Sequence, residues 1–177
     1  MNLPATKIEN VRRKILDTFG DERLGDGRGI FEGDAIDSYA TTEEQSAARQ
    51  RDRDSFGHSS VRETKLDLFD DLWAKVSFGI YNLDDEGSRF FLPLLMLWAL
   101  TIPGPDECTA NQVLWEVAAQ SKKGLFTRTE LPAIGAWLRL EALAESIDYP
   151  DASLGYAACR EAYEEWKAEF PEYVDED

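Results

Sequence analysis

Leu83-Asp-Asp-Glu-Gly-Ser-Arg-Phe-Phe-Leu-Pro-Leu-Leu-Met-Leu-Trp-Ala-Leu100 is the only long segment of this 177-residue sequence that is apolar on nearly every side. A helix that is hydrophobic all round must be enclosed by protein or by lipid. The uncharged run from residue 90 to 103 has 14 residues, whereas a membrane-spanning helix needs about 20. The segment therefore predicts a buried core helix over residues 84–100, capped by Asp84 or Asp85.

The rest of the chain predicts further helices. Five Ser or Thr residues are followed three positions later by Glu or Gln, as in a capping box: Thr6, Thr42, Ser60, Thr109 and Thr127. Together with apolar residues three and four positions apart, they predict helices over residues 6–19, 42–54, 60–76, 109–120, 128–146 and 152–170. Alternating β-branched runs are too short to indicate a sheet. We therefore expect an all-α fold, a single compact bundle of about six helices around the buried helix 84–100.

The length suits one domain, which we expect over residues 1–170, because domains cluster at roughly 100–150 residues. Residues 20–40 are rich in Gly and Asp and are expected to form a loop region, with Ile36 and Tyr39 as a short apolar anchor. The end of the chain, residues 171–177, is expected to be an acidic disordered tail.

Charge is the second conspicuous property of the chain. The net charge is −16, and residues 141–177 alone carry 12 acidic residues against Arg160 and Lys167, a net charge of −10. Such a field repels nucleic acid and anionic membranes and attracts basic partners. It also serves simple solubility, and the sequence leaves both interpretations open. Two distant cysteines and no signal-peptide pattern favour a cytoplasmic protein.

Motifs for metals, nucleotides and covalent catalysis are weak, so we expect no cofactor, metal or catalytic residue. His58 is the only histidine, and Cys108 and Cys159 lack the spacing of a zinc site. Gly25-Asp-Gly-Arg-Gly29 resembles a phosphate loop only superficially, because no strand precedes it and acidic residues surround it. The same acidic residues do not follow the pattern of a calcium-binding loop.

Two groups of carboxylates remain as candidates for chemistry. Glu63, Asp67, Asp70 and Asp71 lie at helical spacing, which suits either a solvated helix face or an acid–base or Mg²⁺ site inside a cleft. The second group is the acidic start of the apolar helix, residues 84–86. Arg89 follows it, and we expect Arg89 to pair with Asp85 four residues earlier. Alternatively, its guanidinium contacts carbonyls freed by Pro93 or holds an anionic ligand.

The order of features around the apolar segment resembles a bacterial family of small helical proteins known only as a domain of unknown function. The shared core, Leu-Asp-x-Glu-Gly-x-Arg-Phe-Phe-Leu-Pro, lies here at residues 83–93. Residues 35–39 are similar to the family's acid–tyrosine segment, and residues 125–138 to its last core helix. The resemblance covers residues 5–145 and departs in the acidic C-terminal helix and tail. It implies a helical fold and no activity.

We therefore predict a non-enzymatic acidic protein-binding module of the inhibitor, immunity-protein or nucleic-acid-mimic type, which docks a basic partner protein and binds neither nucleic acid nor membrane. Its expected binding residues are carboxylates on two helix faces: Asp67, Asp70, Asp71, Glu161, Glu164, Glu165 and Glu169. The alternative is a small carboxylate- or metal-dependent hydrolase using acids of residues 63–71 and 84–86. A third possibility is an oligomeric structural component that buries exposed aromatic residues.

Overall fold

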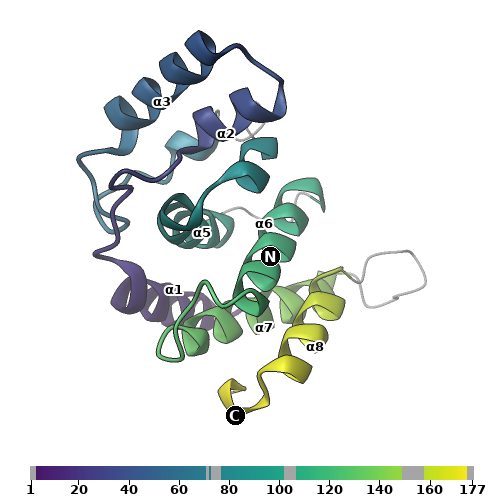
Figure 1. The fold of residues 1–177 in the computed structure, drawn as a ribbon. Coiled ribbons are helices and arrows are strands. Elements are labelled where there is room, and N and C mark those ends of the chain that lie inside the picture. The colour runs from purple at the N-terminus through teal and green to yellow at the C-terminus, as the bar shows by residue number, and fades with distance from the viewer. Residues whose placement is uncertain (1–2, 71, 73–76, 102–106, 149–157, 175–177) are drawn as a thin grey trace. The chain divides into compact units, whose positions relative to one another are not determined.

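The computed structural model of the chain describes residues 3–70, 72, 77–101, 107–148 and 158–174. They are helical and include no strand, apart from one isolated antiparallel bridge between Arg23 and Ser60. The prediction of an all-α fold is confirmed (Figure 1). Contacts group the chain into two compact units: unit 1 comprises Met1–Thr18 and Ala99–Asp177, and unit 2 comprises Phe19–Trp98. One domain over residues 1–170 stays a prediction.

The predicted apolar helix is α5 (Asp85–Ala99). Asp84 lies just before it and accepts a hydrogen bond from the Gly87 amide at 2.8 Å, which satisfies a free donor of the first turn. Every residue from 90 to 100 is buried, as expected for a helix that is apolar on all sides. Among the described helices, none is both long and apolar enough to cross a bilayer.

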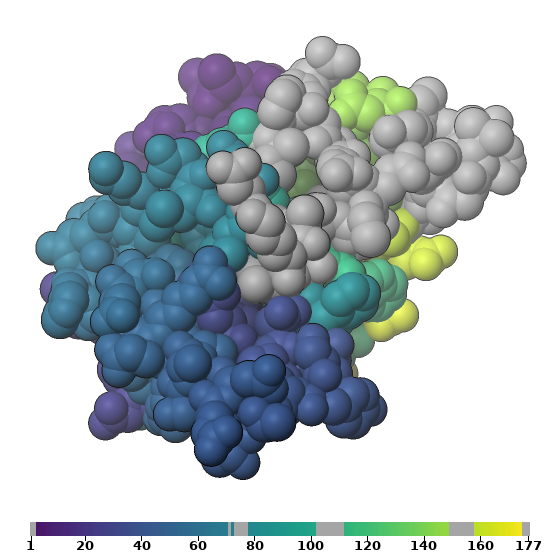
Figure 2. All heavy atoms as spheres, turned by 90° about the horizontal axis from the view of Figure 1, so that it is seen from above, coloured from purple at the N-terminus to yellow at the C-terminus, as the bar shows by residue number. Residues whose placement is uncertain are grey.

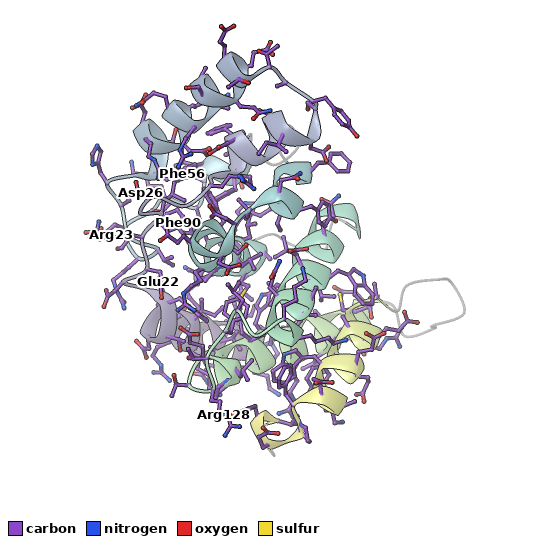
Figure 3. The ribbon with its side chains drawn as sticks, viewed as in Figure 1. Glu22, Arg23, Asp26, Phe56, Phe90 and Arg128 are labelled. Atoms are coloured by element: carbon purple, nitrogen blue, oxygen red, sulfur yellow. The ribbon has the colours of Figure 1, made fainter. Side chains whose placement is uncertain are left out.

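Phe56 anchors the core of unit 2. It ends α3 (Thr42–Phe56), a polar helix whose exposed side forms part of the surface in Figure 2. Its ring lies 5.0 Å from the Phe91 ring and 6.2 Å from the Phe90 ring, with Phe90 close beside it in Figure 3. Phe31 and Phe69 complete the cluster. Edge-to-face aromatic contacts of this kind add to the apolar burial and hold α3 on α5.

The structure differs from the expected loop at residues 20–40, because Ile30–Asp37 form helix α2. Ile36 is half-buried, and Tyr39 projects into solvent with 95% of its surface exposed, so Tyr39 anchors nothing within the described residues. The helix packs on η1 (Ser77–Asn82) through Gly33 and Gly79, whose backbones approach so closely that a Cβ on either would collide with the other segment.

Residues 60–67 form turns where the sequence predicts the first half of a helix. The expected capping contact is present, since the Ser60 amide donates to the Glu63 carboxylate at 2.9 Å. However, the Val61 and Arg62 amides donate to carbonyls of the segment before α2, at residues 22 and 20. These long-range bonds hold the backbone out of a helix. Residues 68–70 and 72 are helical as predicted, and residues 71 and 73–76 lie outside the described residues.

Unit 1 contains α1 (Ala5–Phe19, except its last residue), α6 (Glu107–Lys122), α7 (Leu131–Asp148) and α8 (Ala158–Glu169). Both α6 and α7 contact α8 (Figure 1). Trp137 and Trp166 are fully buried in this unit, and Gly135 leaves room for the Trp166 ring. Instead of a wholly disordered tail, Pro171–Tyr173 form a short 3-10 helix, η3, which contacts α7 and α8. Residues 175–177 lie outside the described residues.

Candidate functional site

The acidic residues predicted on the last helix lie on the exposed side of α8. Cys159, Ala162 and Trp166 occupy its buried side. Two of the exposed carboxylates have cationic neighbours: Glu165 lies 2.9 Å from the Lys122 ammonium, and Glu164 lies 3.6 Å from that of Lys167. Within the described residues Glu161 and Glu169 have no ion pair, so α8 presents carboxylates that the described part of the chain does not neutralise.

The other predicted binding residues belong to unit 2. Asp67 and Asp70 are exposed, and Asp70 accepts a hydrogen bond from the Trp98 indole at 2.8 Å. Asp71 lies outside the described residues. A carboxylate that fixes a tryptophan at the edge of the core has a structural role, while its exposure leaves it accessible to a partner. The two acidic groups belong to different units.

Two acids of the hydrolase alternative, Glu63 and Asp84, hold backbone amides. Glu63 accepts from the Ser60 amide and pairs with Arg23 at 3.2 Å, and these contacts lower its pKa, the bonds to Ser60 being the largest cause. Asp84 caps α5, and Asp85 and Glu86 are exposed. Two cavities formed by described residues of unit 1 are lined by none of these acids. No group of three or more metal-ligating side chains that could hold an ion occurs in the described parts of the chain.

The glycine-rich segment before α2 has its polar groups occupied by the chain itself. The Arg28 amide donates to the Asp84 carboxylate at 2.8 Å. Arg49 donates to the carbonyl of Asp26, and Arg53 donates to the carbonyls of Gly25 and Gly27. A phosphate loop needs free amides directed at its ligand. Here an internal carboxylate takes one such position, and arginines of α3 fix the segment, which is the thin stretch around Asp26 in Figure 3.

The sequence analysis did not identify Asp52 of unit 2, whose role is structural. Its two oxygens accept from the amides of Phe31 and Glu32 at 3.0 and 2.9 Å, so a side chain of α3 caps the N-terminus of α2. Gly29 precedes α2, and a Cβ there would collide with the Asp52 carboxyl. Burial raises the pKa of Asp52 to about 6, although the two amides oppose that shift.

Arg89 makes its ion pair across the fold. Its guanidinium lies 2.8 Å from the Glu22 carboxylate, 67 positions earlier, whereas the sequence predicts Asp85 as the partner. Both side chains are about 30% exposed, at 27% and 31%. The pair joins α5 to the segment before α2, next to the bridge at Arg23. The spacing of charges along the chain carries no signal for such a contact, because the partners meet only after the chain has folded.

Unit 1 buries two further carboxylates beside a thiol. Glu145 accepts from the amides of Cys159 and Arg160 at 3.1 and 3.0 Å, and so caps α8 as Asp52 caps α2. Glu141 is 2% exposed, and its Oε1 has no hydrogen-bond partner among the described residues. Burial raises the pKa of Glu141 to about 7. Burial, followed by the charges of Glu145 and Glu141, raises the pKa of the Cys159 thiol, so this cysteine is an unreactive core residue.

A groove that the sequence did not indicate lies on unit 1. Its main compartment, so called because more residues line it, has a volume of about 370 Å³ and is lined by residues of α1, α7 and α8 and by Tyr173 and Val174. An adjoining compartment of about 430 Å³ shares four of its lining residues. Volumes of this size are ordinary for small-molecule sites. Four segments that are far apart in the chain build the groove, so no local sequence motif predicts it.

The all-α fold and its buried helix α5 define the class of the chain, a small helical protein. The sequence profile "Family of unknown function (DUF6714)" matches residues 7–146, and the chain belongs to this family. The match agrees with the resemblance seen over residues 5–145; the bacterial setting and the shared core motif stay predictions. No curated protein and no solved structure matches the chain. Helix α8 lies beyond the matched region.

Proposed function

We propose that the protein is a non-enzymatic acidic binding module that docks a basic partner protein through the exposed side of α8. The observation that carries the proposal is the division of this helix: Trp166 and its neighbours fix one side in the core, while Glu161, Glu164, Glu165 and Glu169 occupy the other. A helix held rigidly by its apolar side presents its charges in a constant geometry, which favours electrostatic complementarity with a partner.

The net charge of −16 supports the same proposal. Charge of one sign speeds the encounter with a partner of opposite sign, and it disfavours nucleic acid. Asp67 and Asp70 form a second acidic surface in the proposal, on unit 2, and the sequence prediction adds Asp71. The free, buried thiol of Cys159 is compatible with a reducing cytoplasm. Because α8 lies outside the family match, a partner that binds α8 would be specific to this chain and its close relatives.

The test compares binding to a panel of purified basic proteins, half of them nucleic-acid-binding, by isothermal titration calorimetry at two salt concentrations. We expect one or few members to bind, with affinity falling at least tenfold as salt rises from about 50 to about 200 mM. A variant with Gln at Glu161, Glu164, Glu165 and Glu169 should lose most of that affinity.

The matched control removes four exposed acidic charges elsewhere, at Asp17, Asp37, Glu43 and Asp54. Both variants lose the same net charge and therefore the same long-range attraction to the partner. We expect the control to lose at most half as much binding free energy as the α8 variant, because only the α8 variant also loses direct contacts. Equal losses in both variants, or equal binding to every basic protein, would contradict a specific surface on α8. Binding that does not change with salt would contradict the electrostatic mechanism.

A further inference from the structure

The groove on unit 1 differs in charge from the rest of the protein. The chain has 35 acidic and 19 basic residues, yet none of the described residues that line the main compartment of the groove is acidic. The compartment is lined instead by four basic residues, Lys7, Arg13, Lys14 and Arg139. Three of these belong to α1 and one to α7. A set of cations around one cavity, in a strongly acidic chain, makes the groove locally complementary to an anion.

The adjoining compartment extends the groove along α7. Lys7, Arg139, Leu143 and Tyr163 line both compartments, so the two form one continuous site. The second compartment adds Arg160 and Glu164. Both are already paired: Arg160 lies 3.2 Å from Glu145, and Glu164 lies 3.6 Å from Lys167. The main compartment holds four of the five basic residues of the groove, and the acidic side chain among the described lining residues, Glu164, belongs to the second compartment.

The groove also offers apolar surface. Val11 and Leu140 are nearly buried in the main compartment, at 8% and 4% exposed, and Leu143 stays 37% exposed where the two compartments meet. The rings of Tyr163 and Tyr173 add aromatic surface. Covering an exposed leucine beside tyrosine rings with an apolar group is favourable, because it removes apolar surface from water.

We propose that this groove binds a small organic anion with an apolar body, typified by a medium-chain or aromatic carboxylate. The anionic head lies among the cations of α1 and Arg139, and the apolar body covers Leu143, Leu140 and the tyrosine rings. Small-molecule sites combine mostly apolar walls with a few charged groups in this way. The inference does not depend on the binding of a basic partner, because it uses cations rather than the carboxylates of α8.

The direct test titrates the full chain with octanoate, octanamide and octylammonium, which share one apolar body and differ in head-group charge. Calorimetry and ¹H–¹⁵N chemical shifts measure binding at about 50 mM salt. We expect octanoate to bind at least fivefold more tightly than octanamide, octylammonium not to bind, and shifts to concentrate in α1 and α7. Equal affinities for octanoate and octanamide would overturn the proposed role of the cations.

Two variants locate the site, each with a control on the same helix. Leu143→Asp places a carboxylate where the compartments meet, and we expect it to abolish octanoate binding. Ile147→Asp, also on α7 and 43% exposed, lies outside the groove and should bind like the wild type. Lys7→Gln should lower the affinity for octanoate at least threefold without changing the affinity for octanamide. Arg12→Gln should change neither affinity. Both leucine and isoleucine are partly exposed, so each variant is expected to fold, which circular dichroism checks.

Loss of binding in Ile147→Asp equal to that in Leu143→Asp would overturn the assignment to this groove. So would octanoate shifts confined to unit 2, or no binding of octanoate at millimolar concentration. An acidic peptide that binds the same residues while octanoate does not would replace the small-molecule proposal with a peptide site.

Discussion

Asp52 in unit 2 and Glu141 in unit 1 are both almost completely buried carboxylates, yet their surroundings differ. Both oxygens of Asp52 accept backbone amides at the start of α2, whereas one oxygen of Glu141 has no partner among the described residues. Burial raises the pKa of both, to about 6 and about 7. A buried charge is tolerated when hydrogen bonds compensate its lost hydration. The comparison separates a carboxylate that organises the fold from one that the fold merely contains.

The largest expected effect is that of Asp52→Ala, which breaks the organising member of the pair. It removes the cap of α2 and leaves two amides without an acceptor, so we expect a loss of about 3 kcal/mol in the free energy of unfolding. Asp52→Asn keeps one acceptor and should lose about half as much. Urea denaturation measures both. A loss below about 1 kcal/mol in Asp52→Ala would show that α2 does not need this cap.

Glu141→Gln tests the other member. The pKa of Glu141 is raised in the folded state from 4.5 to about 7, so folding favours its neutral form. This contribution to stability is present below pH 4.5 and is lost as pH rises to about 7. Gln cannot ionise, and we expect the variant to be more stable than the wild type by about 2 kcal/mol near pH 8 and no more stable near pH 4.

Urea titrations across that pH range distinguish the two carboxylates. In Glu141→Gln the free energy of unfolding should still fall as pH rises from 3.8 to about 6, because the pKa of Asp52 is raised too. If the variant and the wild type have parallel pH profiles, Glu141 is not the titrating group.

Glu145→Gln sharpens the comparison within unit 1. Glu145 caps α8 through the amides of Cys159 and Arg160, as Asp52 caps α2, so it should behave like Asp52 and unlike its neighbour Glu141. Gln retains one acceptor oxygen, and we expect a loss of about 1.5 kcal/mol in the free energy of unfolding near pH 7. Thermal denaturation followed by circular dichroism measures it. Stabilisation by this substitution would contradict a capping role.

The smallest effect is expected at an exposed cap. Thr41 and Glu44 form a complete capping box at the start of α3, and its bonds lower the pKa of Glu44, the Thr41 amide being the largest cause. Thr41→Ala should cost about 1 kcal/mol in the free energy of unfolding. Thr42→Ala, one position later and outside the box, should cost less and serves as the control. Equal losses would mean that the hydroxyl of Thr41 contributes little as a cap.

Local signals in the sequence predict the helices whose capping residue lies directly before them in the chain. Helix α5 follows from its apolar run and Asp84, and α3 begins at the predicted residue, with Thr41 rather than Thr42 as its cap. Helix α2 was missed because its cap comes from Asp52, about 20 positions further along the chain. The turns at residues 60–67 were missed because distant carbonyls take their amides.

The candidate sites follow the same division. Periodicity places the acidic residues of α8 on one exposed side, so that surface was predictable from a single helix. The groove was not, because Lys7, Arg139 and Tyr173 come from segments far apart in the chain. Arg89 paired with Glu22 instead of Asp85 for the same reason. Charge spacing identifies neighbours within a helix, whereas contacts between segments require the folded chain.

The buried thiol of Cys159 makes the capped end of α8 a natural reporter of local opening. It is 2% exposed, and only its thiolate reacts with an alkylating reagent. In a chain with Ser in place of Cys108, the rate of alkylation would measure how often α8 detaches from its neighbours. Comparing that rate with the rate of global unfolding would reveal whether α8 opens locally or only when the whole protein unfolds.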